Sequence, residues 1–127
     1  MILDERGWAP IWKEILVRDQ LRCVYCGFDG SKDVHAFRQL VASGGLDHLV
    51  PTTQGGLHSV ENLVLCCWPC NKLKGSYDPR PDVMPADSDE KRKVMIEKVR
   101  EYLKPRDWDY YQRVLDEALQ LSGKSAS

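Results

Sequence analysis

The chain has 127 residues, of which 43% are hydrophobic and 29% are charged, and its net charge is -1. This length and balance are typical of a single globular domain rather than of a disordered chain. No apolar run approaches the roughly 20 residues of a membrane span, and a charge so near zero predicts weak non-specific attraction to DNA.

The first segments predict a cytoplasmic protein that begins with a helix. Met1 to Arg6 contain acidic residues where a secretory signal would carry basic ones, so we expect the cytoplasm, where thiols stay reduced. Pro10 suits the first turn of a helix. Apolar residues then recur at helical spacing and predict a helix from Pro10 to Asp19: Ile11, Trp12, Ile15 and Leu16.

The middle of the chain predicts a second helix, a β-hairpin and a third helix. Four apolar residues at helical spacing favour a short helix that ends at Gly44 and Gly45: Val34, Phe37, Leu40 and Val41. Leu46 to Val50 and Leu63 to Cys66 are β-prone runs that flank a polar, Gly-rich loop, which indicates a hairpin. Asn71 then opens a short helix.

The last third of the chain predicts a linker and two helices. Asp78 to Pro85 contain three prolines and form the linker. One amphipathic helix stops before Pro105, and a second starts with Asp107 as its cap, so we expect a helical hairpin with both apolar stripes in the core. The stripes are Val94, Ile96, Val99 and Leu103 in the first helix, and Trp108, Tyr111, Leu115 and Ala118 in the second.

Two Cys-x-x-Cys pairs predict a metal site. Cys23 with Cys26 and Cys67 with Cys70 supply four thiolates, which fill the tetrahedral shell of one structural zinc ion per chain. Either Cys66 or Cys67 could partner Cys70. The two-residue spacing favours Cys67 and makes Cys66 a buried free thiol.

Four further polar residues lie close to these cysteines in the sequence and indicate a second metal site: Asp47, His48, Asn62 and Asn71. Their side chains are hard or borderline ligands, suited to a divalent cation such as magnesium. Asp47 and His48 are neighbours on a predicted strand, so their side chains point to opposite faces unless the strand bends or twists.

The order of these residues resembles the HNH endonuclease family in its zinc-binding four-cysteine form, over about residues 18 to 75. The motif reads Leu46-Asp47-His48-Leu49-Val50-Pro51, Gly55-Gly56, Glu61-Asn62-Leu63-Val64 and Cys67-x-x-Cys70-Asn71-x-x-Lys74-Gly75. The resemblance implies an α+β fold with a small ββα-metal core and a four-cysteine zinc site, flanked by an N-terminal helix and the C-terminal helical hairpin. Residues 1–127 then form a single HNH nuclease domain, with the motif core at 18–75, the linker at 76–87 and the C-terminal helices at 88–123.

The resemblance also implies the roles of the polar residues. His48 is the general base that takes a proton from water, and Asn62 either holds the imidazole of His48 or constrains the loop. Asp47 and Asn71 bind a catalytic Mg²⁺ or Mn²⁺ ion. Asn71 stands where family members often have His. The implied activity is hydrolysis of DNA phosphodiester bonds, with RNA as an alternative substrate.

Three residues are candidates for contacts with the substrate: Lys72, Lys74 and His58. His58 is equally well explained as a solvent-exposed loop residue. His35 is better explained as a surface or packing histidine than as a ligand. A monomer and a homodimer are both compatible with the motif, as is a protein partner that supplies DNA affinity. The competing hypothesis is a catalytically silent, zinc-stabilised module that binds nucleic acid or protein. The presence of Asp47 and His48 together with the two asparagines argues against it, because such a module needs only the cysteines.

Overall fold

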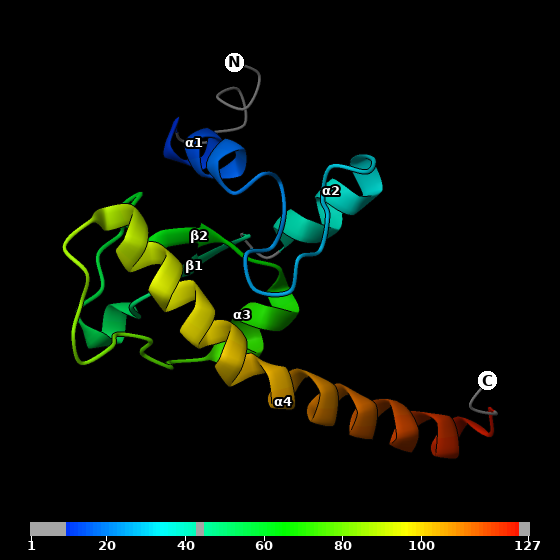
Figure 1. Ribbon diagram of the computed structural model, residues 1–127. Helices are drawn as coiled ribbons and strands as arrows, with labels where there is room; N and C mark the ends of the chain where they lie inside the picture. Colours follow the sequence, from blue (N-terminus) through cyan, green and yellow to red (C-terminus); the bar gives the residue numbers. More distant parts are fainter. Residues whose placement is uncertain (1–9, 43–44, 125–127) are drawn as a thin grey trace.

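The computed structural model describes residues 10–42 and 45–124, apart from the side chains of residues 107 and 108. Helices and a small antiparallel sheet make up an α+β fold (Figure 1), as the sequence predicts. In chain order the elements are α1 (Pro10–Arg18), α2 (Val34–Val41), β1 (Leu46–His48), the 3-10 helix η3 (Thr52–Gln54), β2 (Leu63–Leu65), α3 (Trp68–Lys74) and α4 (Ser88–Ser122).

The first two helices agree closely with their predictions. α1 buries Ile15 and Leu16, which are 0% and 5% exposed. α2 begins after Asp33, whose side chain accepts a hydrogen bond of 2.8 Å from the backbone N–H of Ala36 and so caps the helix. α2 ends at Val41 rather than at the glycines, and Gly44 lies outside the described residues.

The predicted hairpin is confirmed and is short. β1 and β2 are antiparallel, with Asp47 opposite Val64 and His48 opposite Leu63. All three residues of β2 are 0% exposed. A two-stranded ribbon is marginal alone, so the hairpin depends on what packs against it. Asp19, just after α1, accepts a 2.9 Å hydrogen bond from the N–H of Leu65 and ties the first helix to the sheet.

α3 starts earlier than the sequence predicts. It begins at Trp68 rather than Asn71, with Pro69 in its first turn, where the fixed φ of proline fits a helix and its missing N–H costs nothing. Cys70 therefore lies inside the helix. The helix ends at Lys74, and the capping residue after it, Gly75, has a positive φ of 54°.

The predicted C-terminal helical hairpin is wrong, because α4 runs without a break from Ser88 to Ser122 with Pro105 inside it. A proline removes one helical hydrogen bond and crowds the carbonyl four residues before it. Here the side chain of Arg106 donates a 2.7 Å hydrogen bond to the carbonyl oxygen of Tyr102, and its guanidinium lies 3.7 Å from the Tyr102 ring centre. These contacts stabilise the turn that contains the proline.

The two halves of α4 have different surroundings. In the first half, Met95, Val99 and Leu103 are buried and pack with the core below the sheet. The second half extends away from the other elements (Figure 1), and Leu115 is 52% exposed. The second predicted apolar stripe is therefore not part of the core. The side chains of Asp107 and Trp108, predicted as a cap and as part of that stripe, lie outside the described residues.

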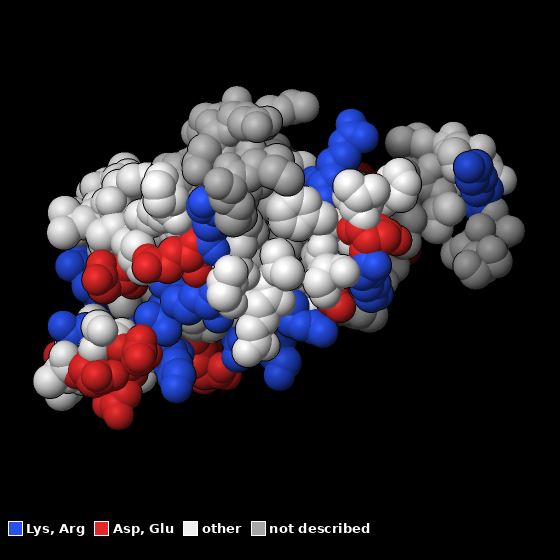
Figure 2. Space-filling view, turned by 90° about the horizontal axis from the view of Figure 1, so that it is seen from above, with Lys and Arg blue, Asp and Glu red and all other residues white. Residues whose placement is uncertain are grey.

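Surface charges of both signs are mixed on the face seen from above (Figure 2), as the near-zero net charge leads one to expect. Within the described part of the chain, no helix combines the length and the apolar character needed to cross a membrane.

Candidate active site and metal centre

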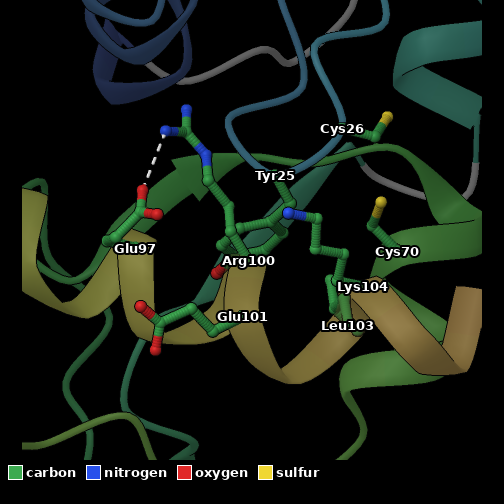
Figure 3. A pocket seen from close by; sticks show the side chains of 8 residues that line it. All are labelled: Tyr25, Cys26, Cys70, Glu97, Arg100, Glu101, Leu103 and Lys104. Carbon is green, nitrogen blue, oxygen red and sulfur yellow. Dashed lines mark hydrogen bonds and ion pairs between the residues drawn. The ribbon is translucent and has the colours of Figure 1, made fainter.

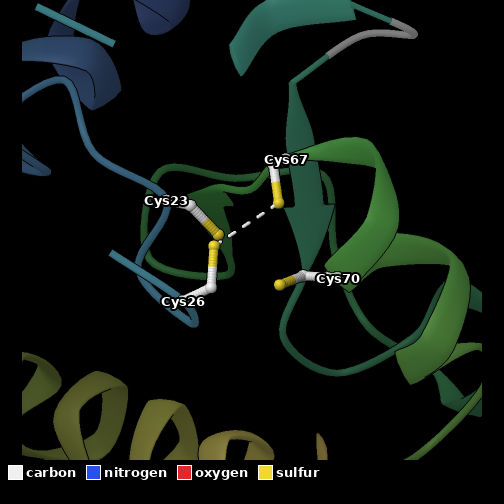
Figure 4. Close-up of side chains that lie close together, drawn as sticks. All are labelled: Cys23, Cys26, Cys67 and Cys70. Atoms are coloured by element: carbon white, nitrogen blue, oxygen red, sulfur yellow. Dashed lines mark hydrogen bonds between the residues drawn. The ribbon is translucent and has the colours of Figure 1, made fainter. Parts of the chain in front are cut away.

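The four predicted cysteine ligands meet at one point. Cys23 and Cys26 lie in the loop after α1, and Cys67 and Cys70 lie at the start of α3. Their Sγ atoms are all within 4.8 Å of one another, and the Sγ atoms of Cys26 and Cys67 are 3.7 Å apart (Figure 4). A tetrahedral ion with Zn–S bonds of about 2.3 Å requires sulfur atoms about 3.8 Å apart. The cluster therefore fits a zinc ion with a closed shell.

Backbone hydrogen bonds hold the first cysteine pair in place. The N–H of Gly27 donates to the carbonyl of Cys23 at 2.9 Å, and Gly27 has a φ of 80°, which favours glycine. The N–H of Val24 donates to the carbonyl of Leu65 at 2.9 Å. The cysteine loop is thus attached directly to β2.

The thiol chemistry of the cluster favours a bound cation. Hydrogen bonds, first from Cys26, hold the pKa of Cys23 below its usual range, whereas the contact with Cys23 raises the pKa of Cys70. A dication removes this conflict, because zinc binds all four cysteines as thiolates.

Cys66 lies outside the ligand group, as the sequence spacing predicts. It is 1% exposed, and its Sγ donates to the carbonyl of Cys67 at 3.2 Å. Its contact with Cys23 and its burial raise its pKa well above the usual range. Cys66 is a buried free thiol.

A hollow of about 450 Å³ lies between the cysteine cluster and α4 (Figure 3). Tyr25, Cys26 and Cys70 line it on one side, and charged residues of both signs on α4 line the other. The side chain of Arg100 donates a hydrogen bond of 2.8 Å to the carbonyl of Val24 and forms an ion pair of 3.3 Å with Glu97. These contacts hold α4 against the cysteine loop, and the mixed charge does not favour a polyanion in the hollow.

Asp47 is buried in a polar cluster under the sheet. It is 7% exposed, and its Oδ2 accepts a 2.6 Å hydrogen bond from the hydroxyl of Tyr25. Nζ of Lys74 lies 3.1 Å from the same oxygen and also donates to the carbonyl of His48 at 2.8 Å. Burial raises the pKa of Asp47, while Lys74 opposes that rise.

The position of Lys74 corrects its predicted role as a phosphate contact. Its side chain is 1% exposed and paired with Asp47, so its ammonium group does not reach the surface. Lys72, one of the other two candidates, is exposed, and its Nζ lies 5.8 Å from the centre of the Trp68 ring.

Asn71 contacts the same strand as Lys74. Nδ2 of Asn71 donates a hydrogen bond to the carbonyl of Leu46 at 3.1 Å. Lys74 follows Asn71 by three residues, so the two side chains lie on the same face of α3. These bonds use Nδ2 of Asn71 and Oδ2 of Asp47, so Oδ1 of each residue is the atom suited to a hard cation. Magnesium commonly binds one or two protein oxygens together with water and substrate phosphate, and this donor set fits that chemistry.

His48 follows Asp47 on β1, so the alternation of side chains along a strand directs the two to opposite faces, and only Asp47 is buried. Its Nε2 is 3.1 Å from Nδ1 of His58, and the two ring centres are 5.2 Å apart. Partial burial, and secondly the neighbouring His58, lower the pKa of His48. The imidazole of His48 is therefore neutral near pH 7.

Asn62 constrains the loop between the strands, which is one of its two predicted roles. Its Oδ1 accepts from the N–H of Val50 at 2.9 Å, and its Nδ2 donates to the carbonyls of Val50 and Leu57 at 3.0 and 2.9 Å. A Cβ atom on Gly56 would lie 1.7 Å from the carbonyl oxygen of Val50, so this close approach requires glycine.

A comparison with protein families agrees with this geometry. Residues 23–77 match the family model described as HNH endonuclease, a little under half of the chain. This segment is therefore similar to HNH endonucleases. It contains the four cysteines, Asp47, His48, Asn62 and Asn71, and its two strands and α3 form the ββα core. Searches of curated proteins and of solved structures gave no match.

Within the HNH segment, two contacts were missed by sequence reasoning. No sequence pattern singled out Tyr25, yet burial and the Asp47 carboxylate raise its pKa, so its hydroxyl stays protonated and donates. The ion pair of Lys74 with Asp47 was also missed. The lysine lies four residues after Cys70 in the motif, but its burial depends on the packing of α3 against β1.

Several arginines near the HNH segment are engaged in internal ion pairs. Arg18 pairs with Asp19, Arg22 with Asp29 and Arg80 with Asp78, at 2.9, 3.3 and 2.6 Å. These pairs reduce the positive charge that is available to phosphates.

Proposed function

We propose that this protein is a divalent-metal-dependent endonuclease that hydrolyses phosphodiester bonds in DNA, with His48 as general base. The observation that carries the proposal is the position of His48 in the HNH segment. Its imidazole is neutral and contacts His58 at 3.1 Å, on a strand that also presents Asp47 and contacts Asn71.

His48 takes a proton from the attacking water molecule. A base of this kind contributes about 10²- to 10⁴-fold to a rate when its pKa lies near the working pH. The lowered pKa of His48 keeps its lone pair available at neutral pH. Asn62 supports this role indirectly, because it fixes the loop that follows β1.

Asp47 and Asn71 would hold the catalytic cation, Mg²⁺ or Mn²⁺, with their side-chain oxygens. When bound, this cation supplies positive charge beside the phosphate and the departing oxygen. Lys74 shares the Asp47 carboxylate at Oδ2 and holds it in place between β1 and α3. The zinc of the four-cysteine centre is structural, because its shell is filled by protein.

Lys72 supplies a sequence-neutral contact to the DNA backbone from the exposed surface of α3. One active centre cuts one strand, so a monomer nicks DNA and a homodimer cuts both strands. A protein partner that adds positive charge would compensate for the net charge of -1. We place this activity in the cytoplasm.

The decisive experiment is cleavage of supercoiled plasmid by the purified protein with Mg²⁺ or Mn²⁺. We expect cleavage by the wild type and at least about 100-fold less by His48→Ala, since the base is removed. His35→Ala is the matched control, because His35 is exposed on α2 and outside the site. Equal cleavage by the wild type and His48→Ala would contradict the role of His48.

A second candidate is a silent, zinc-stabilised module that binds nucleic acid or protein. One observation favours it: the ammonium group of Lys74 already forms an ion pair with the buried carboxylate of Asp47. This hypothesis predicts that the wild type shifts labelled DNA in a gel, or captures a protein, yet leaves plasmid and RNA intact with either metal ion.

A further inference from the structure

His58 contacts His48 in a way that limits which nitrogen of His48 can act as a base. Nε2 of His48 and Nδ1 of His58 are 3.1 Å apart, within hydrogen-bonding distance. When both rings are neutral, one of these two nitrogens carries a proton and donates the hydrogen bond, and the other accepts that hydrogen bond.

Only one of the two arrangements leaves His48 able to take a proton. If Nδ1 of His58 donates, the lone pair on Nε2 of His48 is occupied, and the proton of that neutral ring lies on Nδ1. If Nε2 of His48 donates instead, Nδ1 of His48 keeps a free lone pair. The second arrangement is the one that general-base catalysis requires.

The backbone on both sides of His58 is fixed. The carbonyl of Leu57 accepts a 2.9 Å hydrogen bond from Nδ2 of Asn62, and the carbonyl of Ser59 accepts from the N–H groups of Asn62 and Leu63 at 3.0 and 2.9 Å. Because its two neighbours are tied to the start of β2, His58 is held beside His48 although its own side chain is exposed.

We propose that His58 is a positioning residue: its Nδ1 accepts a hydrogen bond from Nε2–H of His48 and so keeps Nδ1 of His48 free as the base. This inference rests on the proposed nuclease function. When Nδ1 of His48 takes the proton of the attacking water, the Nε2–H group becomes a charge-assisted donor, and its bond to His58 strengthens.

The tautomer can be measured directly on the zinc-loaded, ¹⁵N-labelled protein by two-bond ¹H–¹⁵N correlation spectra. The chain has only three histidines, so His58→Ala and His35→Ala assign the signals. We expect His48 to carry its proton on Nε2 in the wild type and in His35→Ala, and to become a mixture of tautomers in His58→Ala. A proton on Nδ1 of His48, or no change in His58→Ala, overturns the inference.

Steady-state cleavage of a labelled oligonucleotide supplies the second readout. We expect His58→Ala to lower kcat about 10- to 100-fold, the usual loss on removing an orienting partner, with KM nearly unchanged. His58→Asn restores most of the rate, because its amide oxygen can accept from Nε2–H. A higher KM with unchanged kcat would instead make His58 a phosphate contact and overturn the inference.

Failure of this inference is distinguishable from failure of the proposed function. A wild type that never cleaves contradicts the nuclease function, while the tautomer spectra still decide whether His58 orients His48. A wild type that cleaves, with His58→Ala equally active and its His48 tautomer unchanged, contradicts the role of His58 alone.

Discussion

Burial determines the chemistry of single residues on the two faces of β1. On one face, Asp47 is 7% exposed and shares its Oδ2 between Tyr25 and Lys74. On the other, His48 is half-buried and contacts His58. Burial disfavours the charged form of both groups, so it raises the pKa of the acid and lowers that of the imidazole.

The lowered pKa of His48 predicts the pH dependence of cleavage. Because His48 works as a neutral base, kcat/KM rises with pH as the imidazole loses its proton, and the midpoint of this limb lies below about 6.5, the ordinary value for histidine. Rate profiles from pH 5 to 8 measure this midpoint, and a wild-type midpoint above about 6.5 would contradict the prediction.

The buried Lys74 predicts a large loss of stability on substitution. Lys74→Met leaves the Asp47 carboxylate buried without its ionic partner, which costs about 3–5 kcal/mol of unfolding free energy. Urea denaturation of the zinc-loaded protein measures this cost. Lys72→Met, on the exposed side of the same helix, is the matched control and changes stability by about 0.5 kcal/mol or less. Equal effects of the two substitutions would disprove the structural role of Lys74.

At the scale of elements, the four-cysteine centre joins two parts of the chain that lie more than 40 residues apart in the sequence. It connects the loop after α1 to the start of α3, and that loop is hydrogen-bonded to β2 and to Arg100 of α4. Since a two-stranded sheet is marginal alone, a metal ion at this junction contributes to the stability of the whole HNH core.

Two adjacent cysteines provide a matched test of the metal centre. Cys67→Ser removes one of the four ligands, so we expect loss of zinc and a lower unfolding temperature. Cys66→Ala removes a buried thiol outside the cluster, and that protein keeps about one zinc ion per chain. Metal analysis and thermal denaturation measure both effects. Zinc loss in Cys66→Ala alone would reverse the assignment of ligands, and two tightly held ions per chain would contradict a single closed centre.

At the scale of the whole molecule, α4 is partly packed on the core and partly surrounded by solvent. Its first half packs on the core and on α3, and its second half extends beyond both (Figure 1). Buried apolar area stabilises a fold, whereas exposed apolar side chains contribute little. The stability of the monomer therefore depends on the first half of α4.

A pair of leucines on α4 tests this division. Leu103→Ala creates a cavity where the side chain is 5% exposed, and we expect a loss of about 2–5 kcal/mol. Leu115→Ala removes a side chain that is 52% exposed, and we expect a change of about 0.5 kcal/mol or less. Chemical denaturation at several protein concentrations measures both. A large, concentration-dependent loss in Leu115→Ala would show that the second half of α4 is buried in an oligomer.

Local patterns predicted the zinc ligands, the hairpin and the first helices well, because each depends on residues that lie near one another in sequence. Cys67 rather than Cys66 follows from the two-residue spacing, and Leu63 to Leu65 form a strand that the apolar run predicts. The break expected at Pro105 was wrong: α4 continues through the proline, and Arg106 contacts Tyr102, one turn earlier, in a way that the rule for proline does not consider.

The sequence by itself determined which residue types are present for the chemistry: four thiols for zinc, two oxygen donors for a cation and an imidazole for a base. Only the tertiary structure decided which of their atoms are available. Lys74 is buried against Asp47, and His58 lies beside His48, because α3 and the loop between the strands pack against β1. Such contacts join residues 10 to 27 positions apart in the sequence, where no local pattern constrains them.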